Sequence, residues 1–219
     1  MQKFITDFEY KNERDYIHST TMIHALSKII HNGFYPEEEW EVPGIDARFH
    51  KPVHCNGKFY VSEERPDLDK INTVSAAFRY YDARHAISAV FVEDKDTRVV
   101  NRIKTEYYVE DIVAEGDFSG TCMIGCPSTN AMIENIIEAN KKIHQMTLKD
   151  KESLRVVNLY MKKLPVSLPA SNMLNSGKVQ LKIKNVGART RDDSVATLNS
   201  LSFPETSKDS FELSYVVYW

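Results

Sequence analysis

Long hydrophobic runs and cysteines are both scarce in this 219-residue chain, and each scarcity excludes a class of protein. No apolar stretch approaches the roughly 18 residues that cross a bilayer. The N-terminus also lacks the apolar segment of about 7 to 15 residues that marks a secretory signal. Three cysteines are too few, and odd in number, for a disulfide framework. We therefore expect a cytoplasmic protein with no membrane partner.

An excess of charge of one sign is also missing, because acidic and basic residues mix along the chain and leave a net charge of −3. A protein that binds nucleic acid over its whole surface carries a strong basic excess, so we expect no nucleic-acid partner. The cysteines and histidines do not show the paired spacing of zinc ligands. The sequence accordingly predicts no metal site and no cofactor.

What the chain does contain is an internal match across its length. Asp7-Phe8 is followed after thirteen residues by Met22-Ile23. Asp117-Phe118 is followed after thirteen residues by Met132-Ile133, and each dipeptide stands 110 residues from its counterpart. This spacing exceeds the roughly 20 to 50 residues of solenoid repeats, so it indicates two copies of a domain-sized unit.

The same order of secondary structure is expected in a first domain, residues 1–105, and a second domain, residues 106–219. In each, an aromatic-bearing strand precedes an amphipathic helix, whose apolar residues recur at helical spacing from Met22 or from Met132. Hydroxyl side chains are expected to cap both helices, Ser19 or Thr20 for the first and Ser128 or Thr129 for the second. Four strands follow each helix, at residues 46–49, 58–62, 73–81 and 86–93, and at residues 156–161, 178–184, 194–203 and 211–219.

One long apolar helix wrapped by a bent antiparallel sheet resembles the hot-dog superfamily, and the duplication resembles its tandem, double hot-dog form. The predicted fold class is therefore α+β. An α+β sandwich of another topology, or two halves that match by chance, are the alternatives. The resemblance implies that the chain acts on an acyl thioester of coenzyme A or acyl carrier protein, as a thioesterase or hydroxyacyl dehydratase in a biosynthetic pathway. It also allows a homo-oligomer.

The two thirteen-residue segments between the matching dipeptides, which we call the spacers, differ in their chemistry. This difference points to the first helix start as the active one. His18 is the expected acid or base, because its ordinary pKa of about 6.5 suits proton transfer at neutral pH. Asp15 would orient His18 or act as the base itself, and Tyr16 would donate a hydrogen bond to an oxyanion. At the equivalent places the second spacer has Gly125, Cys126 and Ser128.

A helix N-terminus presents unpaired N–H groups and a partial positive charge, which stabilise the negative charge that develops on a thioester carbonyl. Two further functions stay open beside this one. One is a non-catalytic hot-dog module that binds an acyl ligand or a partner chain. The other is an acyltransferase or decarboxylase that uses Tyr16 or Cys126, whose thiolate a helix N-terminus would stabilise. The expected substrate-binding residues are Ser19, Thr20, Thr21, Cys126, Ser128 and Asn130.

Overall fold

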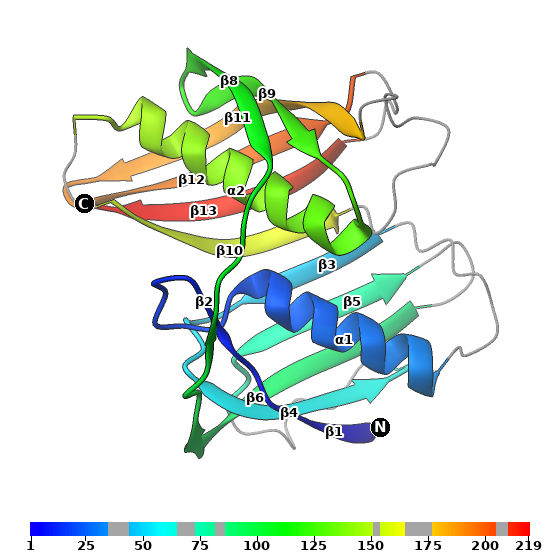
Figure 1. Ribbon diagram of the computed structural model, residues 1–219. Coiled ribbons are helices and arrows are strands. Elements are labelled where there is room, and N and C mark those ends of the chain that lie inside the picture. The colour runs from blue at the N-terminus through cyan, green and yellow to red at the C-terminus, as the bar shows by residue number, and fades with distance from the viewer. Residues whose placement is uncertain (35–43, 65–72, 82–85, 151–153, 165–176, 205–209) are drawn as a thin grey trace. The chain divides into compact units, whose positions relative to one another are not determined.

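Two compact units, Met1–Glu106 and Tyr107–Trp219, make up the chain in the computed structural model (Figure 1). The division lies one residue from the boundary expected from the sequence. The structure describes residues 1–34, 44–64, 73–81, 86–150, 154–164, 177–204 and 210–219, without the side chains of residues 129 and 130. Neither helix in these ranges combines the length and hydropathy of a membrane-spanning segment.

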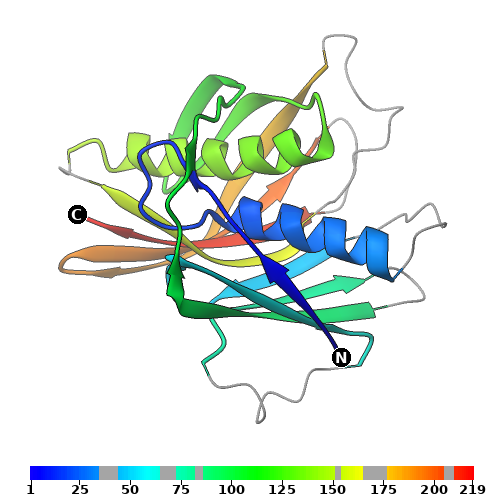
Figure 2. The same cartoon turned by 60° about the horizontal axis from the view of Figure 1, so that its bottom comes forward.

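In the first unit, helix α1 lies against one face of a five-stranded antiparallel sheet (Figure 2). The sheet has the strand order β1-β4-β6-β5-β3, and β2 pairs separately with β7. The hydroxyl of Tyr80 on the sheet donates to the carbonyl of Ile23 on the helix over 3.2 Å. The elements are β1 (Gln2–Thr6), β2 (Tyr10–Lys11), α1 (Ser19–Gly33), β3 (Gly44–Phe49), β4 (Cys55–Ser62), β5 (Ala76–Tyr81), β6 (Ala86–Arg98) and β7 (Arg102–Ile103).

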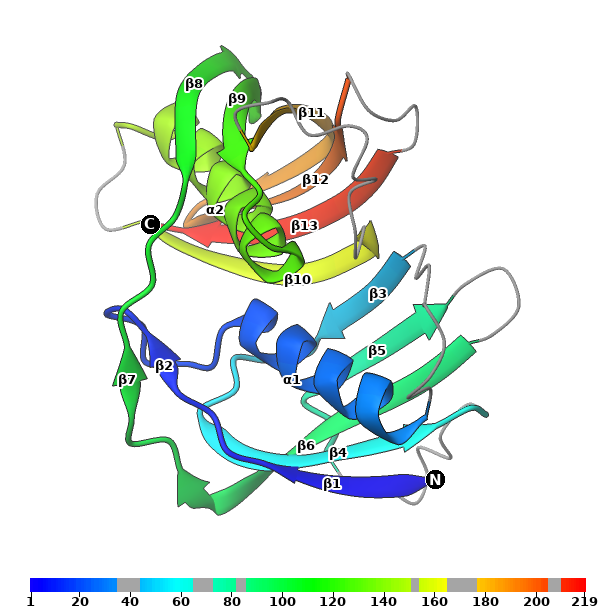
Figure 3. The ribbon, with the colours of Figure 1, turned by 45° about the vertical axis from the view of Figure 1, so that its right-hand side comes forward.

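The second unit places helix α2 against a six-stranded antiparallel sheet with the strand order β8-β9-β11-β12-β13-β10 (Figure 3). Here Tyr215 on β13 reaches the carbonyl of Ile137 on α2, at 3.5 Å. The elements are β8 (Val109–Gly116), β9 (Ser119–Gly125), α2 (Thr129–Thr147), β10 (Arg155–Leu164), β11 (Lys178–Arg191), β12 (Ser194–Ser202) and β13 (Ser210–Tyr218).

Each unit thus has the hot-dog arrangement, and the chain is a double hot-dog protein, as its sequence predicts. The helix periodicity is the reason that the prediction is right. Met22 and Ile23 are fully buried in α1, and Met132 and Ile133 are about as completely buried in α2. An apolar stripe is removed from water when the helix packs that face against another element, which in each unit is the sheet.

Two features of the expected repeat are wrong in detail. Asp7-Phe8 follows strand β1, whereas Asp117-Phe118 lies between β8 and β9, so the matching dipeptides are not structurally equivalent. The strands also differ in spatial order. In the first unit β4 pairs with β6, the later of the last two strands. In the second unit the corresponding strand β11 pairs with β12, the earlier of the last two strands. The last two strands of the first unit are therefore exchanged relative to those of the second.

The second unit buries a histidine among polar neighbours in its core. His144 on α2 is fully buried, with Nδ1 2.7 Å from the carbonyl oxygen of Asn140 and Nε2 2.6 Å from the hydroxyl of Thr197 on β12. Because a carbonyl only accepts, Nδ1 carries the hydrogen, and Nε2 accepts from the threonine. His144 is thus held neutral, and burial lowers its pKa below the ordinary value of 6.5.

This histidine is expected to make stability depend on pH. Unfolded His144 binds a proton below about pH 6.5, whereas the folded form resists it, so the stabilisation is complete above that pH and is lost as the pH falls. We expect the free energy of unfolding, measured in urea, to fall by up to about 1.4 kcal/mol per pH unit. The slope should be shallower in His144→Gln. Equal slopes in the two proteins would contradict the assignment.

Candidate active site at the start of α1

The segment that leads into α1 is pinned to the segment that leads into β4. The backbone N–H of Ile17 donates to the carbonyl of Val53 over 2.7 Å, and Nδ1 of His54 lies 2.7 Å from the carbonyl oxygen of Asp15. The hydroxyl of Tyr10 donates to the carbonyl of His54 over 2.8 Å. The position of the helix start therefore depends on where residues 53 and 54 are held.

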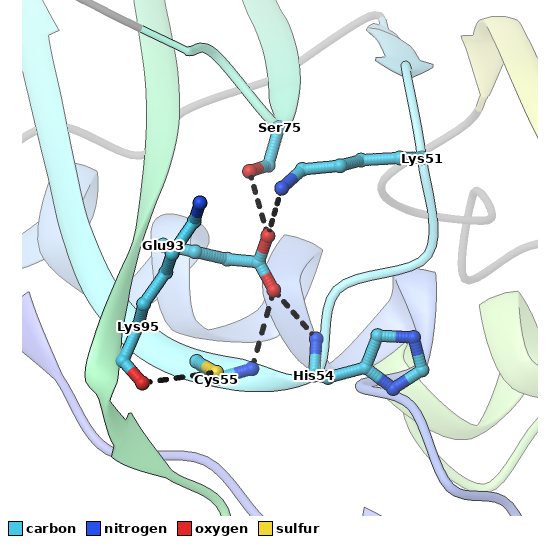
Figure 4. Close-up of polar contacts among 6 residues, drawn as sticks. All are labelled: Lys51, His54, Cys55, Ser75, Glu93 and Lys95. Atoms are coloured by element: carbon cyan, nitrogen blue, oxygen red, sulfur yellow. Dashed lines mark hydrogen bonds and ion pairs between the residues drawn. The ribbon is translucent and has the colours of Figure 1, made fainter.

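A single carboxylate holds that second segment (Figure 4). Oε1 of Glu93 accepts from the backbone N–H groups of His54 and Cys55, at 2.7 and 3.3 Å. Oε2 accepts from the hydroxyl of Ser75 at 3.2 Å and pairs with the ammonium of Lys51. Burial raises the pKa of Glu93, but the bonds from Lys51 and from the two N–H groups outweigh this and lower it below 4.5.

His18 occupies the N-cap position of α1, and its side chain makes no capping bond. The expectation that Ser19 or Thr20 caps this helix is therefore wrong. The physical reason is that the Thr20 hydroxyl is used elsewhere: it lies 2.8 Å from Nδ1 of His18 and accepts from Nζ of Lys11 at 3.1 Å. All three side chains are more than 90% buried, with exposed fractions of 6%, 0% and 4% for His18, Thr20 and Lys11.

The hydrogen bonds of the Thr20 hydroxyl bear on the tautomer of His18. An ammonium can only donate, so Lys11 uses a lone pair of the Thr20 oxygen. The oxygen has a second lone pair, which can accept from Nδ1 of neutral His18; in that tautomer Nε2 carries no hydrogen and can take a proton. The result is a line of groups from Lys11 through Thr20 to His18, which we call the Lys11 relay.

The other residues expected at this helix start differ in their exposure. Asp15 is exposed and provides its backbone carbonyl to His54, and Tyr16 is half-buried. The hydroxyls of Ser19 and Thr21 are buried and have no hydrogen-bond partner among the described residues. Buried hydroxyl groups are nearly always bonded, so these two are suited to a polar group of a ligand.

The start of α2 is closed by contacts within the protein. Ser128 caps this helix as predicted, its hydroxyl oxygen accepting from the N–H of Ala131 at 3.2 Å. The backbone of Gly125 bonds to the carbonyl of Tyr108 at 2.9 Å and to the side chain of Asn135 at 2.7 Å. The predicted residue Asn130 lies in α2, and its side chain is outside the described part. A ligand at this helix start would have to displace a side-chain cap, which α1 does not have.

Cys126 does not have the properties of a nucleophile. Its side chain is 98% buried, since only 2% is exposed, and burial raises the pKa of the thiol to about 11. The expectation of a thiolate stabilised by the helix N-terminus is therefore wrong, because desolvation outweighs the helix dipole. Within the described residues, no group of three or more histidine, cysteine or acidic side chains could hold a metal ion.

Lys11 and Glu93 are the two residues of this region that the sequence reasoning missed. Lys11 stands between an aromatic and a polar residue with no motif around it. Glu93 begins a run of charged residues that reads as a solvated strand end. Only their burial in the folded chain distinguishes them from surface charges.

Comparisons with known proteins give similarity to solved structures alone. No protein-family model and no curated protein matches the chain. It is similar to a Lactobacillus plantarum protein named as an oleoyl thioesterase, at 11% identity over 99% of this chain and 95% of that one, with a TM-score of 0.48.

Two further solved structures have the same degree of similarity. One is the tesB protein of Mycobacterium avium subspecies paratuberculosis, at 9% identity over 99% of this chain and 92% of that one, with a TM-score of 0.49. The other is the dehydratase domain of RzxB from Pseudomonas fluorescens, at 9% identity over 99% and 94%, with a TM-score of 0.48. At such low identities the chemistry of this chain has to be derived from its own residues.

Proposed function

We propose that the chain is an enzyme that acts on an acyl thioester at the start of α1. The observation that carries the proposal is the Lys11 relay, which places a buried ammonium and a buried imidazole beside a helix N-terminus whose N-cap side chain makes no capping bond. A positive charge held at this place stabilises a carbonyl oxygen that becomes an oxyanion in the transition state.

The groups of the site have separate roles in this reaction. Lys11 and the first N–H groups of α1 stabilise the negative charge on the thioester oxygen. His18 takes a proton from the attacking water or, in a hydroxyacyl substrate, from the carbon next to the carbonyl. It then returns the proton to the leaving thiolate or hydroxyl. Thr20 is a positioning residue that fixes the ring of His18.

The remaining predicted residues complete the site. Ser19 and Thr21 offer buried hydroxyls to the polar part of the substrate. Tyr16 and Asp15 lie in the segment before the helix, where Tyr16 would donate to the oxyanion and Asp15 would contact the carrier end of the substrate. Hydrolysis and dehydration both use this set, and the acyl group is carried on coenzyme A or on an acyl carrier protein. The site is active in the first unit only.

The test is turnover of a panel of acyl-CoA and acyl-carrier thioesters, scored for thiol release and for water loss. Lys11→Met should lower kcat by about 100-fold, because it removes a charge that acts on the transition state, while KM changes little. Methionine fills the same buried volume, so the fold is expected to persist. Lys3→Met, at an exposed lysine of the same unit, is the matched control.

Absence of turnover with every thioester would overturn the enzymatic proposal. In that case, binding of a non-hydrolysable acyl-CoA analogue, measured by calorimetry, decides whether the chain is an acyl-binding module. Equal activity of the Lys11→Met and Lys3→Met variants would show that Lys11 has no part in the reaction.

A further inference from the structure

Strand β11 carries cations on the outer face of the second unit's sheet, and four of them lie on the part of the strand that pairs with β12. Its pairing with β12 shows this, because the partners of the four are Ser202, Ser200, Ala196 and Ser194, which are separated by even numbers of residues along a regular strand. Residues separated by even numbers on a strand share one face. The core face of β12 is formed instead by residues such as Val195 and Leu201, which are buried. The four cations, which we call the basic row, are Lys182, Lys184, Arg189 and Arg191.

A β-bulge produces the alignment. Lys184 and Arg189 are separated by an odd number of residues and would face opposite sides of a regular strand. Between Asn185 and Gly187 the register shifts, so that the extra residue Val186 turns the rest of β11 over. Arg189 and Arg191 thereby join the two lysines on the outer face. Without the bulge, the two guanidinium groups would lie on the face of the sheet that packs against α2.

The cations of the basic row have no acidic partners within the described residues. Neighbouring lysines of the same sheet do: Lys162 lies 3.7 Å from a carboxylate oxygen of Glu212, and Lys178 pairs with Glu110. All four side chains of the row are exposed. The carboxylates of Asp192 and Asp193 follow in the turn, beyond the end of the row. The two lysines are about 7 Å apart along the strand, and so are the two arginines; like charges at this spacing repel one another and favour an acidic partner.

The residues beside the row indicate what kind of partner fits. Its four partners on β12 are serines and an alanine, which offer a flat surface without an aromatic ring. Single-stranded nucleic acid is bound by stacking successive bases on several aromatic side chains, whereas the exposed ring described beside the row is that of Tyr218, the partner of Ser194 at one end of it. A protein surface with carboxylates spaced along a helix or loop requires only the charges.

We propose that the basic row docks an acidic protein and, resting on the proposed function, that this protein is the acyl carrier protein that delivers the thioester. The row adds binding energy for the carrier and none for the acyl group. It therefore makes the enzyme prefer a carrier-bound thioester over the same acyl group on coenzyme A.

The experiment compares kcat/KM for one acyl group on the two carriers. In a variant with all four cations of the row changed to glutamine, kcat/KM for the acyl carrier protein should fall by about tenfold or more, and kcat/KM for acyl-CoA should stay unchanged. The wild-type preference should also weaken as salt rises, because exposed charges are screened. The matched control changes four exposed lysines elsewhere to glutamine: Lys3, Lys95, Lys104 and Lys149.

Affinity for the carrier is measured separately, by fluorescence anisotropy of labelled apo acyl carrier protein. A loss of affinity in the row variant and not in the control supports docking even if no thioester is turned over, in which case only the proposed function fails. Equal losses in both variants, or no loss in either, overturn the docking proposal. Tight binding of a single-stranded RNA oligonucleotide that depends on the row, without binding of the carrier, overturns it as well.

Discussion

Replacing His18 with glutamine is expected to lower kcat for an acyl thioester by about 100- to 10,000-fold, the range that general acid–base catalysis contributes. Glutamine keeps a polar group near the Thr20 hydroxyl, which lies 2.8 Å from Nδ1 in the native protein. It cannot transfer a proton at neutral pH. The loss should therefore appear in kcat, with KM and the free energy of unfolding changed much less.

His31→Gln is the control for this substitution, because His31 is an exposed histidine in the last turn of the same helix. Steady-state kinetics and urea unfolding on both variants separate a chemical effect from a structural one. If His18→Gln turned over the thioester as fast as His31→Gln does, His18 would be excluded as the acid or base, and the site would have to be sought elsewhere.

Replacing Glu93 with glutamine is expected to destabilise the protein by about 2 to 4 kcal/mol, because all four groups around this carboxylate are donors. A glutamine amide has one oxygen, and its NH₂ group must face at least one of those donors. The ammonium of Lys51 loses its counter-ion at the same time. Urea unfolding measures the loss.

Glu110→Gln provides the control, since Glu110 is an exposed carboxylate that also pairs with a lysine, and exposed pairs contribute roughly 0 to 1 kcal/mol. The pH dependence gives a second readout. The pKa of Glu93 is lowered on folding, so its stabilisation is present above about pH 4.5 and is lost as the pH falls below it. A Glu93→Gln variant as stable as Glu110→Gln, with the wild-type acid response, would contradict the role assigned to Glu93.

The sequence predicts the elements because each is a local pattern. The apolar stripe that begins at Met22 fixes the first turn of α1, and Met132 does the same for α2. Because the start of α1 is predicted correctly, the position of His18 immediately before this helix is predicted correctly as well. Pairing partners are not local, however, and strand periodicity is the same whichever neighbour a strand has. The exchange of the last two strands in the first unit is for that reason invisible in the sequence.

The parts of the site that escaped prediction depend on contacts between distant residues. Glu93 is 39 residues from His54, and its role exists only because β6 brings it beside the start of β4. Lys11 lies nine residues before Thr20, outside any helical or strand spacing that would bring the two together. The prediction for Cys126 is wrong for the opposite reason. Its position in the sequence, just before a helix, indicates a stabilised thiolate, but its burial in the folded protein raises the pKa of the thiol.

The exchanged strands also affect how the two units reach their folded states. In the second unit, three pairs of consecutive strands are hairpins, β8 with β9, β11 with β12 and β12 with β13. In the first unit the only such pair in the described sheet is β5 with β6, and β1 must find β4, with partners such as Gln2 and Val61. Closing longer loops slows folding. The C-terminal unit also has two distant pairings, β9 with β11 and β10 with β13, but a larger part of its sheet can form from local hairpins than in the N-terminal unit.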